Sequence, residues 1–133
     1  MEKNSKIVTE ISAGELLDKM SILEIKLEKI KNKDNQIQIF KEYDILKKTL
    51  DMNIKLTDEL STLIKEIKKV NLTLWDIEDK LRICEKDKNF NEQFIKLARD
   101  VYFNNDKRAK IKSKINTILG SSIREIKQYV DYK

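Results

Sequence analysis

The chain has 133 residues, of which 38% are charged and 40% hydrophobic, and its formal net charge is +5. This length suits one domain, residues 1–133, that can bury a core without disulfides or metal. Cys84 is the only cysteine and histidine is absent, which excludes intrachain disulfides, zinc-finger ligand sets and histidine-based catalysis within one chain. A reducing cytoplasm is the expected location.

No segment has the length and apolarity of a membrane span, which needs roughly 18 uninterrupted apolar residues. The first residues also lack the apolar run of a signal peptide. We therefore expect a soluble protein without a membrane span. Residues 1–11 are expected to be a flexible lead and residues 121–133 a tail.

Helix is the only regular structure that this composition favours. Proline is absent, and Gly14 and Gly120 are the only glycines, so there is little turn chemistry for a sheet. No heptad is sustained over the whole length, which argues against a simple rod. The sequence predicts an all-α fold, a compact bundle of about four helices built from helical hairpins.

The first helix is predicted to begin at Ala13, because Ser12 and Glu15 form a capping box. Ile22 and Ile25 lie on a different side of this helix from its main apolar stripe, and a second subunit could cover them. We therefore expect a homodimer with Ile22 and Ile25 at the interface. The main stripe consists of Leu16, Met20, Leu23, Leu27 and Ile30.

The polar residues 32–35 predict a turn, and residues 37 to about 56 a second helix. Thr57 could cap a third helix, but no glycine or proline requires a break there, so one uninterrupted helix to Glu85 stays an alternative.

Asp87 to Asn89 predict the next turn, with Asn89 and Glu92 as a capping pair for a fourth helix. That helix should end where Gly120 adopts a left-handed conformation. A short further helix could follow within residues 121–133.

Polar side chains interrupt the apolar stripes of the last two long helices. Glu78 and Glu85 fall in the stripe of residues 60–85, and Arg108 falls in that of residues 94–119. Charges on a buried face are costly unless they are paired. If these helices pack antiparallel, Arg108 could face Glu78 or Glu85. The full candidate set is Asn71, Trp75, Glu78, Arg82, Glu85, Tyr102, Asn104 and Arg108.

Two interpretations of this set stay open. One is an internal salt-bridge network that serves packing. The other is a pocket for a small anionic ligand, in which an arginine fork holds phosphate or carboxylate oxygens and Trp75 or Tyr102 stacks on a ring.

A metal-dependent helical phosphohydrolase is an alternative function, because such enzymes hold magnesium with carboxylates on facing helices. Its candidate ligands recur easily by chance in a chain so rich in acids, and no glycine-rich phosphate loop is present. We therefore assign no catalytic residue, metal ligand or cofactor, and favour a non-enzymatic role. The carboxylates in question are Glu24, Glu28, Asp76, Glu78 and Asp79.

The excess positive charge lies after Asn89, where the chain has ten basic and five acidic residues. The basic run between Lys107 and Lys114 suggests weak nucleic-acid binding as a second alternative. The modest net charge and the absence of interleaved aromatic residues count against it.

The segments EISAGELLDKMSILEIKLEKI and LWDIEDKLRICEKDKNFNEQFIKLARDVYFNNDKRAKIKSKINTILGSS resemble a small all-helical bacterial and phage family of unknown function. The likeness is weaker across residues 32–70 and best at residues 74–82 and 97–108. Some members of that family are found near genes for glycosyltransferases and surface polysaccharides. The resemblance implies a shared site and suggests a partner in polysaccharide or glycosyl-transfer machinery. We predict a binding or assembly module that takes a protein partner or a small anionic ligand.

Overall fold

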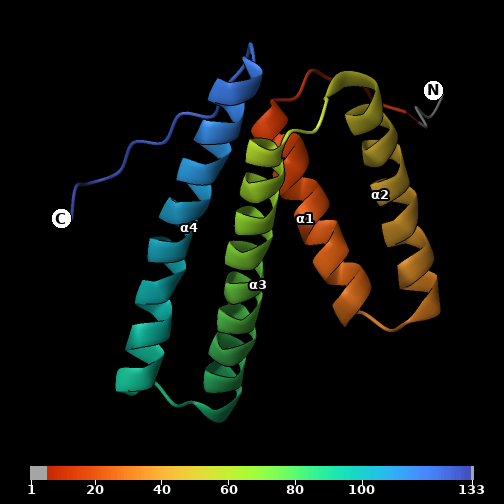
Figure 1. Ribbon diagram of the computed structural model, residues 1–133. Coiled ribbons are helices and arrows are strands. Elements are labelled where there is room, and N and C mark those ends of the chain that lie inside the picture. Colours follow the sequence, from red (N-terminus) through yellow and green to blue (C-terminus); the bar gives the residue numbers. More distant parts are fainter. Residues whose placement is uncertain (1–5, 133) are drawn as a thin grey trace, which may run out of the picture.

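The computed structural model describes residues 6–132, and four helices form this part of the protein (Figure 1). They pair as two helical hairpins, so the predicted all-α bundle is confirmed. Within the described range, no helix combines the length and the apolarity needed to cross a membrane. The helices are α1 (Ala13–Lys29), α2 (Lys33–Asn53), α3 (Asp58–Asp87) and α4 (Glu92–Leu119).

Local capping chemistry sets most of the helix ends. The Ser12 hydroxyl accepts a hydrogen bond from the backbone N–H of Glu15, and Thr57 does the same for Leu60. Thr57 therefore begins a separate third helix, and α2 and α3 are not continuous. Gly120 ends α4 with φ +61°, the left-handed conformation expected of a glycine cap.

Three predicted boundaries are wrong. α2 begins before residue 37, because the Asn32 side chain caps it by accepting from a backbone N–H of its first turn. α4 is capped by Asn91 rather than Asn89. Residues 121–132 form no helix; side chains of this segment instead hydrogen-bond to α4, as Tyr132 does to Asp106. The expected flexible lead over residues 1–11 lies partly outside the described residues, and those of it that are described precede α1.

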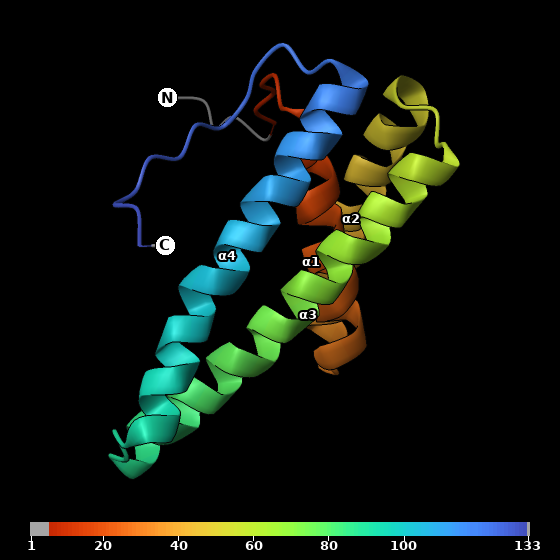
Figure 2. The same cartoon turned by 60° about the vertical axis from the view of Figure 1, so that its left-hand side comes forward.

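α1 is the central helix of the bundle and packs against the other three. It has 17 residues, whereas α3 has 30 and α4 has 28. The α3–α4 hairpin therefore extends past the end of α1 (Figure 2), by roughly 15–20 Å at 1.5 Å per residue. The buried core near the other end consists of Leu16, Leu17, Met20, Leu50, Leu60, Leu63, Ile67, Ile111 and Ile115.

The start of α1 lies unusually close to α4. The Gly14 N–H donates to Oδ1 of Asn116 at 2.6 Å, and a Cβ at Gly14 would lie only 2.6 Å from the carbonyl oxygen of Lys112. Only glycine permits this approach. One turn further along α1, the same approach brings Asp18 alongside Arg108 and Lys112.

Candidate functional site

A fully buried carboxylate, that of Asp18, lies where α1, α3 and α4 meet. Its Oδ1 accepts from Nε of Arg108 at 2.9 Å, and its Oδ2 accepts from Nη2 of the same guanidinium at 2.5 Å. The Arg108 side chain is 28% exposed. This two-bond, charge-assisted pairing fixes both the position and the plane of the guanidinium.

Neutral polar groups complete the surroundings of the carboxylate. Nδ2 of Asn71 donates at 2.8 Å both to Oδ1 of Asp18 and to Oγ of Ser21, and the Ser21 hydroxyl donates to the carbonyl of Asp18 at 2.7 Å. Across residues 6–132, no buried side-chain nitrogen or oxygen lacks a hydrogen-bond partner. The polar centre is fully satisfied, which is the condition for burying charge at acceptable cost.

Lys112 adds a second cation beside Asp18. Its Nζ lies 2.7 Å from Glu15, 3.0 Å from Glu125 and 3.7 Å from Oδ2 of Asp18. Burial lowers the pKa of Lys112, but hydrogen bonds to Glu15 and Glu125 outweigh it and the pKa is raised. The hydrogen bond with Asp18 likewise raises the pKa of Arg108. Both cations therefore stay charged.

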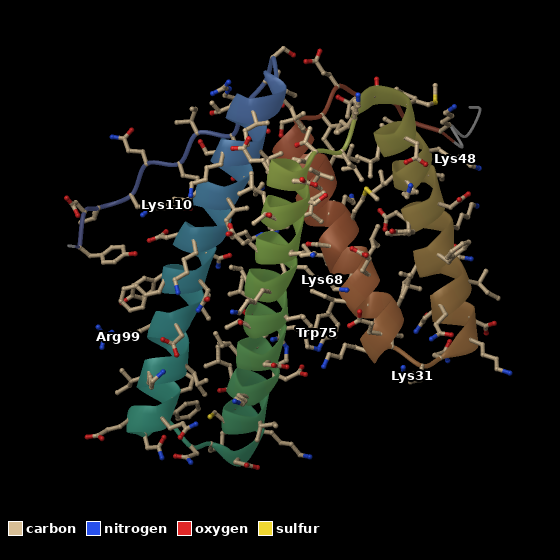
Figure 3. The ribbon with its side chains drawn as sticks, in the orientation of Figure 1. Lys31, Lys48, Lys68, Trp75, Arg99 and Lys110 are labelled. Carbon is tan, nitrogen blue, oxygen red and sulfur yellow. The ribbon has the colours of Figure 1, made fainter. Side chains whose placement is uncertain are left out.

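Beside this centre lies an open pocket of about 440 Å³, lined by residues of α1, α3 and α4. Figure 3 shows Trp75 on the side of α3 that faces α1. The volume is within the range of small-molecule sites. The pocket is lined by Ile22, Ile25, Asn71, Leu74, Trp75, Glu78, Asp79, Arg82, Asn105 and Arg108.

Arg108 connects the buried centre to the pocket. Asp18 occupies Nε and Nη2 of its guanidinium, and in the described part of the chain Nη1 hydrogen-bonds to no other group. Arg108 also lines the pocket. The remaining N–H groups of this fixed guanidinium are therefore available to a ligand in the pocket.

A family model described as "Family of unknown function (DUF6165)" matches residues 7–132. The chain belongs to this family. The match also spans residues 32–70, where the likeness seen in the sequence was weakest. No curated protein and no solved structure matches the chain.

Five predicted site residues of this DUF6165 protein come together at the one pocket. Besides Arg108, they all lie on α3, where spacings of three and four residues place them on one face. Nη1 of Arg82 lies 2.6 Å from Oε2 of Glu78, so Glu78 has a partner on its own helix. The five residues are Asn71, Trp75, Glu78, Arg82 and Arg108.

The other three predicted residues lie elsewhere. Glu85 is exposed and pairs with Lys88. Tyr102 packs edge-on against Tyr132, outside the pocket. Asn104 donates to the carbonyl of Asp100 within α4.

Arg108 forms its ion pair with Asp18 of α1 and not with Glu78 or Glu85, although Glu78 lines the same pocket. The sequence interpretation considered the packing of α3 against α4 and did not include α1. In the folded chain α1 packs against both helices, and its Asp18 forms the ion pair with Arg108.

The sequence interpretation missed Asp18, Ser21, Asn105 and Lys112. A signal for Asp18 was present, because it precedes Ile22 by four residues and Ile25 by seven, and so interrupts the second apolar stripe of the first helix. A charge in an apolar stripe was the argument used for Arg108, and it applies equally to Asp18.

The two isoleucines expected at a subunit interface contribute to the pocket within one chain. Ile25 is 1% exposed and Ile22 is half-buried. The second apolar stripe of α1 therefore lies at a pocket that it shares with residues of α3 and α4.

The carboxylates considered for metal are divided among different partners. Glu28 pairs with Lys68 at 2.8 Å and Glu78 with Arg82, while burial raises the pKa of Glu24. Among residues 6–132, no group of three or more Cys, Asp or Glu side chains could hold a metal ion.

Proposed function

We propose that this protein is a binding module whose inter-helix pocket holds a small ligand with one anionic group and a hydroxylated ring, such as a sugar phosphate. The observation that carries the proposal is the Arg108 guanidinium, which is fixed by buried Asp18 and lines the pocket with no hydrogen bond from Nη1 to any of residues 6–132. A preorganised arginine suits phosphate or carboxylate oxygens, because its geometry needs little reordering on binding.

The rest of the lining supports a sugar rather than a simple anion. Trp75 offers an aromatic surface on which a ring can pack. Glu78 and Asp79 are acceptors for hydroxyl groups, and Asn105 can both donate and accept. The two carboxylates and two arginines of the lining balance in charge, which favours a ligand with few charges and many hydroxyls.

The resemblance stated from the sequence agrees with this ligand class, since it implies relatives near genes for glycosyltransferases and surface polysaccharides. A role beside glycosyl-transfer machinery, with a protein partner, follows as part of the same proposal. The homodimer and the cytoplasmic location both stay predictions; sedimentation velocity over a range of concentrations tests the homodimer.

The fluorescence of Trp75 tests the ligand proposal, because Trp75 is the only tryptophan of the chain and lines the pocket. We expect saturable quenching by glucose 1-phosphate or UDP-glucose. Arg108→Met should weaken this binding about tenfold to a hundredfold, the value of one or two hydrogen bonds to a charged group. Arg99→Met is the matched control, since Arg99 lies outside the pocket over the Phe103 ring.

A second variant keeps the test decisive if Arg108→Met folds poorly. Asp79 lines the pocket and is exposed, so Asp79→Asn should retain the fold and lose affinity for the sugar. If the parent protein responds to neither glucose 1-phosphate, UDP-glucose nor UDP, the ligand proposal fails and the polar centre is structural. A stabilising shift with Mg²⁺ or Mn²⁺ that Glu78→Gln abolishes would instead support the phosphohydrolase alternative.

A further inference from the structure

A second hollow, of about 390 Å³, is lined by residues of α3 and α4 only, whereas the first pocket also includes residues of α1. Neighbouring residues of α4 divide between the two hollows, since Asn105 and Arg108 line the first pocket while Asn104 and Lys107 line the second. We call this second hollow the lysine groove. It is lined by Glu66, Lys69, Val70, Thr73, Asn104, Lys107, Lys110, Ile111 and Lys114.

Positive charge predominates in the lysine groove. Lys69 comes from α3, and Lys107, Lys110 and Lys114 come from one face of α4. None of these four ammonium groups pairs with a carboxylate of residues 6–132, whereas Glu66 is the one acid of the lining. Figure 3 shows Lys110 on the side of α4 away from α1. The first pocket, by contrast, is lined by equal numbers of cations and acids.

We infer that the lysine groove binds a small ligand carrying two or more adjacent phosphates. Each ammonium is a compact charge that suits phosphate oxygens. Lys107 and Lys114 are seven residues apart, about 10 Å along the helix axis, a length over which a short chain of phosphates can meet several ammonium groups at once. The polar side chains of Thr73 and Asn104 border the same groove.

The geometry favours a small polyphosphate over a nucleic acid. Even single DNA-binding modules bury about 600–1,000 Å², which would extend far beyond these four lysines. The groove is also a hollow between two helices, whereas duplex recognition usually places a protruding helix in the major groove.

Calorimetric titration of the full chain with inorganic tripolyphosphate tests this inference. We expect one binding site per chain. The triple variant Lys107→Gln, Lys110→Gln, Lys114→Gln should weaken binding at least tenfold. The control variant Lys33→Gln, Lys41→Gln, Lys86→Gln removes the same charge from exposed positions elsewhere and should change the affinity less than twofold. Tripolyphosphate should leave the fluorescence of Trp75 unchanged, because Trp75 lines the first pocket and not the lysine groove; this separates the two sites.

Three results would overturn the inference. The parent protein could fail to bind tripolyphosphate, or both triple variants could lose affinity equally, which would indicate an effect of net charge alone. A mixed-sequence DNA duplex could bind more tightly than tripolyphosphate, with affinity falling steeply as salt rises, which would assign these lysines to nucleic acid.

Discussion

Asp18 and Arg108 lie 90 residues apart in the sequence and share two hydrogen bonds, of 2.9 and 2.5 Å, at the junction of α1 and α4. The carboxylate is fully buried, whereas the arginine reaches the pocket. The pair therefore joins the stability of the bundle to the chemistry of the candidate site, because the group that would contact a ligand is oriented by a group that a ligand cannot reach.

Replacing the buried carboxylate by its neutral isostere should destabilise the protein strongly. Asp18→Asn removes the negative charge opposite Arg108 and beside Lys112. We expect a loss of about 3 kcal/mol in the free energy of unfolding, since an uncompensated buried charge costs 3–5 kcal/mol. Urea unfolding followed by circular dichroism measures it.

Removing both charges provides the control. Asp18→Leu combined with Arg108→Met should cost less than the sum of the two single variants, by about 1 kcal/mol or more, because neither charge is then left unpaired. Additive losses would show that the two side chains do not depend on each other for stability.

Asn71 should contribute to stability through its two hydrogen bonds, one to Asp18 and one to Ser21. Asn71→Ala removes one donor from each acceptor; Oδ1 of Asp18 keeps Nε of Arg108, whereas Oγ of Ser21 loses its donor, and the expected cost is about 1–3 kcal/mol. Asn104→Ala is the matched control, because Asn104 bonds only to a carbonyl of its own helix and should cost under about 1 kcal/mol. Equal losses in unfolding by urea would contradict the role assigned to Asn71.

The elements of this fold were predictable because their signals are local. Ser12 and Thr57 cap helices whichever tertiary structure follows, and Gly120 ends one for the same reason. The false boundary at Asn89 arose because Asn91 two residues later offers the same capping chemistry. Neighbouring asparagines cannot be separated by pattern alone.

The site was predictable only in part, because pairing between distant helices has no local signal. Asn71 and Arg108 were both in the candidate set, Arg108 because of its place in an apolar stripe, and both lie at the polar centre. Their partner Asp18 depends on how α1 crosses α4 at Gly14, which periodicity within one helix cannot give. Tyr102 and Glu85 were included in the candidate set from helical periodicity and residue type, and neither lines the pocket in the folded chain.

The two glycines should respond differently to substitution. Gly14→Ala places a methyl group against the carbonyl of Lys112, and we expect a loss of about 1–3 kcal/mol from this overpacking. Gly120→Ala meets no atom within 4 Å but must adopt φ +61°, at a cost of about 1 kcal/mol.

Asparagine distinguishes the two mechanisms, because it tolerates the left-handed conformation but is larger than alanine. Gly120→Asn should recover most of the stability lost in Gly120→Ala, whereas Gly14→Asn should be at least as unstable as Gly14→Ala. Thermal unfolding of the four variants tests this. A stable Gly14→Asn would show that α1 does not approach α4 as closely as the structure has it.

The phenol of Tyr132 should report on the docking of the tail against α4. Its hydrogen bond to Asp106 raises the pKa of Tyr132 from 10.0 to about 12. Because the folded-state pKa is raised, this contact contributes to stability fully below pH 10, and the contribution is lost as the pH rises from 10 through about 12. Burial also raises the pKa of Tyr43, so tyrosinate absorbance should show late titration from two phenols. Tyr132→Phe should remove the Tyr132 part of that late step, and Asp106→Asn should return it towards pH 10, while the Tyr43 part remains. Tyr129→Phe is the control, since Tyr129 is an exposed residue of the same tail, and it should leave both late phenols in place. If Tyr132→Phe leaves the late step unchanged, the tail is not held at Asp106 in solution.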